Sequence, residues 1–174
     1  AAWHRAQHRM PVIGITGSNG KTVVKEWLYQ LLHKDYRIVR SPKSYNSQLG
    51  VPLSVWNMKE GDTLAIFEAG ISQPGEMERL ENIIRPDIGV LTNIGEVHNE
   101  GFTGKDQKRD EKLKLFVNSQ LLIGRESDLQ NKFPVTSVTI ITWGAAAHND
   151  LQVKHIDKRE DHTVINLCAG SMEK

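Results

Sequence analysis

The sequence predicts an α/β domain of P-loop type, with a mostly parallel, twisted sheet flanked by helices. Short apolar, β-branched runs alternate with helical segments, which is the pattern of βαβ units. The first apolar run leads into a glycine-rich loop that ends in Lys-Thr, and a helix begins directly after it. Strand, loop and helix in this order are typical of nucleotide phosphate sites. Near the C-terminus, the pattern favours an antiparallel strand pair.

The glycine-rich loop is the stretch around which the other elements are organised. Val12 to Thr22 reads VIGITGSNGKT. Its glycines permit a concave backbone lined by N–H groups, which binds anions together with the N-terminus of the next helix. The pattern departs from GxxxxGK[ST], because Ile15 stands where the first glycine would be, so the loop is of a shorter type. The expected ATP-binding residues are Gly17, Ser18, Asn19, Gly20, Lys21 and Thr22, with Lys21 on the terminal phosphates and Thr22 on Mg²⁺.

Composition limits the classes of function. The chain has 174 residues, of which 39% are hydrophobic, and this suffices for the core of one domain. A net charge of +1 gives no reason to expect a nucleic acid or an anionic membrane as partner. No stretch is long and apolar enough for membrane insertion or a signal peptide, so a soluble, cytoplasmic protein is expected. Cys168, in an alternating apolar run, is expected to be a packed thiol.

The elements of the first half follow in order from the N-terminus. Residues 1–8 are expected to form a short helix, and residues 22–33 a helix that packs on the sheet. In this helix Trp27 is expected in the core, because it belongs to an apolar series at helical spacing. Residues 36–40 read as a strand, followed by a polar loop and a helix with Pro52 in its first turn.

The next strand ends in a carboxylate. Residues 63–67, TLAIF, form a continuous apolar run of the kind found in buried parallel strands, and Glu68 follows directly. Open α/β sheets bind ligands at the carboxyl ends of their strands, so a Glu beside a phosphate loop is suited to coordinate Mg²⁺. From the residue pattern alone, a capping or surface glutamate is an equally weighted alternative.

The second half continues the alternation. A helix is expected from about Pro74 to before Pro86, a buried strand at 88–91, and a basic helix from 105 to 116. On the residue pattern alone, His98 reads as a loop histidine and Lys112 as part of a solvated face. Residues 135–143, 151–156 and 163–167 read as strands, the last two as the antiparallel pair.

Five segments in this order resemble the central ATP-binding domain of the Mur ligase family. They are VIGITGSNGKT, YNSQLGVPLSV, FEAGISQPGEME, RPDIGVLTNIGEVHNEGF and EKLKLF, and they cover about residues 9–117. The segments EAGISQPGEME and GVPLSV are most similar to the branch that adds D-alanyl-D-alanine to UDP-N-acetylmuramoyl-tripeptide in peptidoglycan synthesis. VVKEWLYQLL and RSPKSYNSQLGVPLSVW resemble the variety in which this ligase is fused to an alanine racemase.

The resemblance implies roles for single residues, with ATP and Mg²⁺ as cofactors. Lys21 would act on the transferred phosphate, and Thr22 and Glu68 would hold Mg²⁺. The resemblance makes His98 a ligand of a second Mg²⁺, and Lys112 a lysine that becomes a metal ligand as its carbamate. Catalytic roles are thus implied for Lys21, Glu68, His98 and Lys112, ATP contact also for Asn93, and substrate contact for Asn46 and Ser47.

The resemblance also implies a reaction and a domain arrangement. A substrate carboxylate takes the γ-phosphate of ATP, and the acyl phosphate then takes the amine of D-alanyl-D-alanine, with release of ADP and phosphate. Members of the family have an N-terminal UDP-binding domain and a C-terminal domain as well. Residues 1–174 therefore read as a single, truncated central domain that is inactive alone. The part of the chain past Phe116 is hard to match to the family, and we identify in it no segment of the Asn-Asp type that touches the nucleotide.

Three alternatives stay open. The first is another Mur ligase or a folylpolyglutamate synthase-like ligase. The second is a non-catalytic nucleotide-binding module, which a solvent-facing Lys112 far from Glu68 and His98 would favour. The third is a small-molecule kinase, disfavoured by the short loop and the lack of an obvious lid.

Overall fold

The computed structural model describes residues 1–95, 101–129 and 137–170, and is built around one mixed sheet. In these residues the sheet has eight strands in the order β2-β3-β1-β4-β5-β6-β7-β8. All neighbouring pairs are parallel except β7 and β8. The strands are β1 (Val12–Thr16), β2 (Ile38–Arg40), β3 (Leu64–Glu68), β4 (Ile88–Leu91), β5 (Leu121–Arg125), β6 (Thr139–Gly144), β7 (Leu151–Lys158) and β8 (Thr163–Ala169). The predicted fold class is confirmed.

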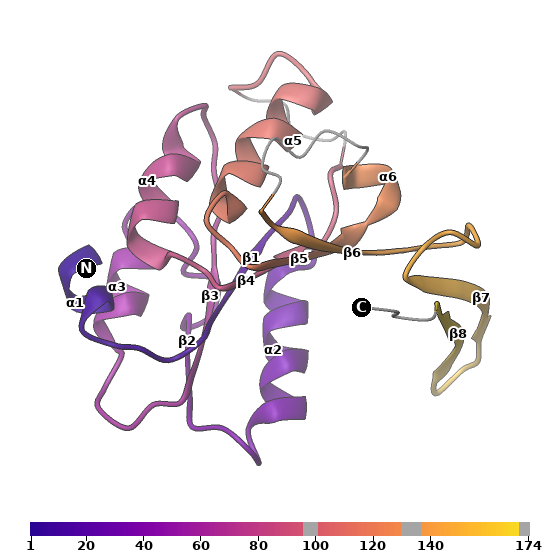
Figure 1. Cartoon of the computed structure of the whole chain (residues 1–174), viewed down its shortest axis with the longest axis horizontal. Helices are drawn as coiled ribbons and strands as arrows, with labels where there is room; N and C mark the ends of the chain where they lie inside the picture. The colour runs from indigo at the N-terminus through magenta and orange to yellow at the C-terminus, as the bar shows by residue number, and fades with distance from the viewer. Residues whose placement is uncertain (96–100, 130–136, 171–174) are drawn as a thin grey trace.

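Helices cover the two faces of the sheet (Figure 1). Their bounds are α1 (Ala2–Ala6), α2 (Lys21–Leu32), α3 (Gly50–Trp56), α4 (Glu76–Ile84), α5 (Lys105–Leu113), the 3₁₀ turn η1 (Lys114–Phe116) and α6 (Glu126–Leu129). Successive residues of a strand point to opposite faces, so Val12 packs with α3, α4 and η1, whereas Ile13 packs under α2. This alternation explains why the central strands are apolar at every position: both faces are buried.

Fewer apolar side chains of α2 pack against the sheet than the sequence predicts. Its side chains Val24, Leu28 and Leu32 pack against the sheet. Trp27 is 63% exposed, so its predicted place in the core is wrong. A helix lying on a sheet buries one stripe, and Trp27 lies on the outer side of α2 together with the exposed Val23 and Leu31.

The C-terminal part confirms the antiparallel pair and corrects one expectation. β7 and β8 pair from Leu151 with Ala169 to Lys158 with Thr163, and this pair forms the yellow edge of the molecule in Figure 1. Every residue of β8 is exposed, so Cys168 is an exposed thiol rather than a packed one. The elements β5 and α6 were not predicted.

None of the helices in the described ranges has the length and apolar character that a membrane crossing requires.

Gly89 lies where β4 meets η1, and we expect its substitution to destabilise the domain. A Cβ atom at Gly89 would lie 2.4 Å from Cδ1 of Phe116, a fully buried ring. Gly89→Ala should therefore lower the free energy of unfolding by about 1–3 kcal/mol, measured by urea denaturation. Gly104→Ala is the control, because a Cβ there meets no atom within 4 Å; it should cost less than about 1 kcal/mol. Equal losses in the two variants would contradict this account.

Candidate functional site

The two glycines of the phosphate loop serve different purposes. The loop joins the end of β1 to the start of α2. Gly17 has a φ of +147°, and a Cβ on it would lie 1.9 Å from Thr92 Oγ1, so only glycine permits this close packing. Gly20 has a φ of +80° and precedes the first turn of α2, and the space around it is open. The open side of Gly20 leaves room for an anion at the helix N-terminus.

The segment after β4 holds the loop in place. The backbone N–H of Ser18 donates to Asn93 O at 2.8 Å, and that of Asn19 donates to Asn93 Oδ1 at 3.0 Å. Thr92 Oγ1 donates to Asn19 O at 2.6 Å. Asn93, predicted to contact ATP, thus braces the loop in this structure. The first N–H groups of α2 have no intrahelical acceptor and are therefore the donors available to a phosphate.

The three predicted phosphate and Mg²⁺ groups lie next to one another. Lys21 Nζ donates to Gly17 O at 2.8 Å. Burial lowers the pKa of Lys21, while the charge of Glu68 acts in the opposite direction. Thr22 Oγ1 donates to Glu68 Oε2 at 3.0 Å, and Glu68 is fully buried at the end of β3. The alternative of a surface glutamate is therefore wrong.

Lys112 is buried beside the phosphate loop, so its interpretation as part of a solvated face is wrong. Its side chain is 2% exposed, and Nζ donates to Gly17 O at 3.2 Å. Burial, with further contributions from the charges of Lys21 and Lys108, lowers the pKa of Lys112 to about 7. The neighbouring Glu111 explains the placement, because its Oε1 accepts the N–H of Gly75 at 2.6 Å and ties α5 to the start of α4.

One cavity of about 530 Å³ brings the predicted residues together. Its lining comes from the phosphate loop, the loops after β2 and β3, the segment before α5, and α5 itself. The predicted residues among the lining are Gly17, Ser18, Asn19, Lys21, Asn46, Ser47 and Lys112. The remaining lining residues were not among the predicted site residues: Gly70, Ile71, Ser72, Phe102 and Lys108. Lys108 was detectable, because it stands one helical turn before Lys112 on the same helix face. His98 lies outside the described residues.

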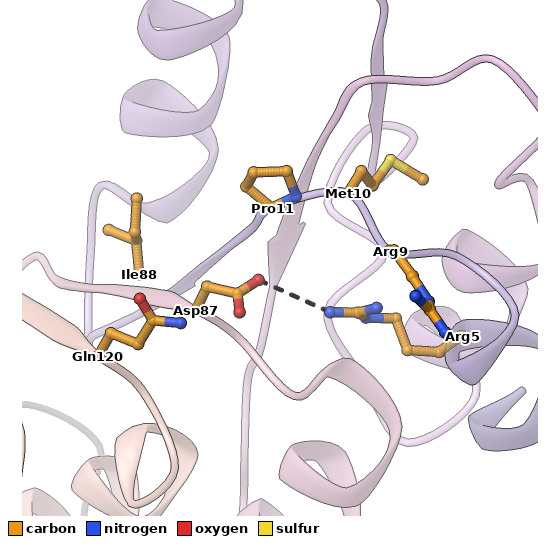
Figure 2. Close-up of a pocket in the computed structure, with 7 residues that line it drawn as sticks. All are labelled: Arg5, Arg9, Met10, Pro11, Asp87, Ile88 and Gln120. Carbon is orange, nitrogen blue, oxygen red and sulfur yellow. Dashed lines mark ion pairs between the residues drawn. The ribbon is translucent and has the colours of Figure 1, made fainter.

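A second cavity, of about 560 Å³, lies at the opposite edge of the sheet (Figure 2). Its residues Pro11, Asp87 and Gln120 directly precede β1, β4 and β5. The carboxylate of Asp87 in this cavity already interacts with other protein groups. Its Oδ2 accepts the N–H of Val12 at 2.8 Å, and the guanidinium of Arg5 lies 3.8 Å away. Ligands of open α/β sheets bind at the carboxyl ends of the strands. The cavity at the phosphate loop is therefore the candidate site.

The candidate site suits a nucleotide with Mg²⁺. Lys21, Lys108 and Lys112 line the cavity and favour an anionic ligand. Thr22 and Glu68 offer hard oxygen ligands of the type that Mg²⁺ prefers. In the part of the chain that the structure describes, no group of three or more His, Cys, Asp or Glu side chains could hold a metal.

The fold and the loop define an α/β nucleotide-binding domain of P-loop type. Residues 15–173 match the Mur ligase middle domain, and the chain belongs to this family. The UDP-N-acetylmuramoyl-tripeptide–D-alanyl-D-alanine ligase of Bacillus subtilis is 34% identical over 157 residues, which cover 87% of this chain and 34% of that protein. This chain thus spans about a third of the length of that curated relative.

Solved structures agree with this assignment. The MurF structure from Acinetobacter baumannii superimposes with a TM-score of 0.88 at 25% identity, covering 97% of this chain and 38% of that one. MurF from Thermotoga maritima, in complex with ADP, gives a TM-score of 0.85 at 28% identity, covering 97% of this chain and 40% of that one. In both, the match extends through the C-terminal strands, beyond the segments that carry the resemblance in sequence.

Proposed function

We propose that this chain is the central ATP-binding domain of a longer, cytoplasmic ligase of peptidoglycan synthesis. The ligase joins D-alanyl-D-alanine to UDP-N-acetylmuramoyl-tripeptide and converts ATP to ADP and phosphate. The observation that carries the proposal is the cavity in which the phosphate loop, Asn46, Ser47 and Lys112 meet. The name of the Bacillus subtilis relative supports the choice of substrates. The N-terminal UDP-binding and C-terminal domains belong to the rest of the polypeptide, so this domain alone does not ligate.

Each residue of the site has a role in this proposal. Lys21 neutralises the phosphate that is transferred, and Asn46 and Ser47 face the muramoyl-peptide. Thr22 and Glu68 would hold Mg²⁺, with His98 as ligand of a second ion. When bound, Mg²⁺ neutralises phosphate charge so that a substrate carboxylate can approach the γ-phosphate.

The same proposal makes Lys112 a carbamate, which replaces a cation by an oxygen ligand. Carbamate forms from CO₂ and a neutral amine. With its pKa lowered to about 7, a large fraction of the Lys112 amines is neutral at pH 7. An unperturbed lysine has roughly one neutral amine in three thousand at that pH. Lys21 and Lys108 also favour the anionic carbamate electrostatically, because both are cations close to Lys112.

We expect a carbamate at Lys112, besides the one formed by the N-terminal amine, when this chain is equilibrated with ¹³C-bicarbonate and observed by ¹³C NMR at pH 7.5. Since carbamate needs the neutral amine, its occupancy at constant dissolved CO₂ should rise from pH 6 to pH 8, around the lowered pKa of Lys112. Lys112→Arg should abolish the Lys112 signal and leave that of the N-terminal amine, whereas Lys34→Arg, at an exposed position, should retain both. A carbamate spectrum that is the same in wild type and Lys112→Arg would refute the assignment.

The reaction itself is tested with the full-length ligase that carries this domain. Phosphate release should require both UDP-N-acetylmuramoyl-tripeptide and D-alanyl-D-alanine, with formation of one amide for each ATP. Transfer of the γ-phosphate to a hydroxyl acceptor would show a kinase instead, and ligation of glutamate to a folate would show the related synthase. Amide formation by this chain alone would contradict the proposed division between domains.

A non-catalytic nucleotide-binding module is the weaker alternative, because Lys112 is buried in the cavity instead of facing solvent.

We also propose that the parent polypeptide is covalently fused to an alanine racemase. The segments VVKEWLYQLL and RSPKSYNSQLGVPLSVW support this by resemblance only. The mass of the native polypeptide and an assay of alanine racemisation test it; a ligase-sized protein without racemase activity would exclude the fusion.

A further inference from the structure

Lys25 is a buried cation in the candidate site that neither the sequence prediction nor the proposed reaction uses. It is fully buried on α2. Its Nζ lies 2.9 Å from Glu68 Oε1 and 3.2 Å from Glu26 Oε1. Glu26 is partly exposed and is shared with Arg40 at 3.1 Å, so Glu68 is the buried partner of Lys25.

Lys25 and Thr22 hold Glu68 from two sides. They are three residues apart on α2 and therefore face the same way. Thr22 Oγ1 donates to Oε2 of Glu68, while Lys25 lies beside Oε1. Both oxygens of the proposed Mg²⁺ ligand are thus engaged by protein groups, and the direction of the carboxylate is set.

The same ammonium fixes the loop after β2. Lys25 Nζ donates to Ser41 O at 2.9 Å and also to Lys43 O. Lys43 has a φ of +47°, a left-handed conformation that a lysine rarely adopts, so the contact helps to hold a strained turn. This turn leads directly to Asn46 and Ser47 in the cavity wall.

Lys25 also affects the net charge around the proposed Mg²⁺ ligand Glu68. It compensates the charge of Glu68, and Lys21, Lys108 and Lys112 line the adjacent cavity. Among the described residues that line this cavity there is no Asp or Glu. A divalent cation that approaches alone therefore meets a site without net negative charge. A nucleotide supplies the negative charge through its phosphates.

We propose that Lys25 is a positioning residue that neutralises Glu68 in the nucleotide-free protein, so that Mg²⁺ enters the site together with the nucleotide phosphates. The inference deepens the proposed function and rests on it, because it takes Glu68 as a metal ligand. According to this proposal, the ion pair of Lys25 and Glu68 prevents Mg²⁺ from binding before the nucleotide.

Mn²⁺ binding to this chain, followed by electron paramagnetic resonance, tests the proposal without any ligation. Wild type without nucleotide should bind Mn²⁺ weakly, and Lys25→Met should bind it at least about tenfold more tightly, because a nearby positive charge is removed. Adding Glu68→Gln to Lys25→Met should remove the gain. Lys34→Met, which deletes an exposed lysine, should change the affinity less than about twofold.

Thermal unfolding gives a second readout. Lys25→Met leaves Glu68 buried without its cation, so its Tm should fall in metal-free buffer and recover with Mn²⁺. Mn²⁺ alone should leave the Tm of wild type unchanged, and a purely structural ion pair would not produce this rescue. If Lys25→Met does not fold, Lys25→Gln replaces it, because this variant removes the charge and keeps a side-chain donor for Ser41 O; the same gain in Mn²⁺ affinity is expected, and no gain overturns the role of Lys25.

The outcomes separate the inference from the proposed function. Tight Mn²⁺ binding by nucleotide-free wild type, or no gain in a folded Lys25→Met, overturns the role of Lys25 and leaves the ligase proposal standing. Failure of wild type to bind Mn²⁺ even with a non-hydrolysable ATP analogue overturns the assignment of the metal site and, with it, the inference. Weak binding alone and strong binding with the analogue support the proposal.

Discussion

Replacing Lys21 by methionine is expected to weaken binding of Mg²⁺–ATP to this chain by about 10- to 150-fold. The ammonium of Lys21 lies in the loop cavity, where it donates to Gly17 O at 2.8 Å. We expect it to bind a phosphate instead when the nucleotide is present. Hydrogen bonds to charged groups contribute about 1.5–3 kcal/mol, which corresponds to this range of affinity. In the full-length ligase, the loss of a charge that acts on the transferred phosphate should lower kcat by about 100- to 1,000-fold.

Isothermal titration calorimetry, with and without Mg²⁺, measures the effect on binding. Lys154→Met is the matched control, because it removes an exposed lysine of β7 far along the sheet from the loop; it should bind ATP like wild type. Equal affinity of wild type and Lys21→Met would place the nucleotide elsewhere. A folded wild-type chain that binds no ATP would show that the other domains complete the nucleotide site.

Replacing Lys112 by methionine is expected to give a domain that is more stable and a ligase that is inactive. Lys112 is almost fully buried, and its lowered pKa means that the folded state disfavours the ammonium. Methionine fills similar space without this penalty, and Gly17 O keeps a donor in Lys21. The gain in the free energy of unfolding at pH 7 should be on the order of a few kcal/mol in CO₂-free buffer. Ligation should fall by at least about 100-fold, because no carbamate can form.

The pH dependence of this gain has a defined sign. The pKa of Lys112 is about 7 in the folded protein and 10.5 without the influence of the fold. Between these values the unfolded state binds more protons, so the stability of wild type increases with pH. The advantage of Lys112→Met should therefore be constant below about pH 7, shrink from pH 7 to 10.5 and vanish above it. Denaturation curves at several pH values check this, and an advantage independent of pH would refute the burial penalty.

Several parts of the site follow from local sequence, because local patterns determine them. A glycine-rich stretch between a β-branched run and a helix indicates an anion loop, and the structure has this loop between β1 and α2. Likewise an apolar run that ends in Glu68 places a carboxylate at the binding edge of a parallel sheet. The antiparallel β7–β8 pair was predicted from alternation and a polar turn in the same way.

The sequence by itself therefore determined the fold class, the phosphate loop and the strand-end glutamate, since each depends on residues close together in the chain. Only the tertiary structure decided which side chains are buried. Lys112 reads as a solvated residue in a basic helix, and Trp27 as a core residue, yet the first is 2% and the second 63% exposed. The reason is that burial depends on what packs over a helix. The contact of Glu111 with α4 brings α5 over the site, while the outer stripe of α2 is left exposed. The buried pair of Lys25 and Glu68 arises in the same manner, from two segments that meet only in the folded sheet.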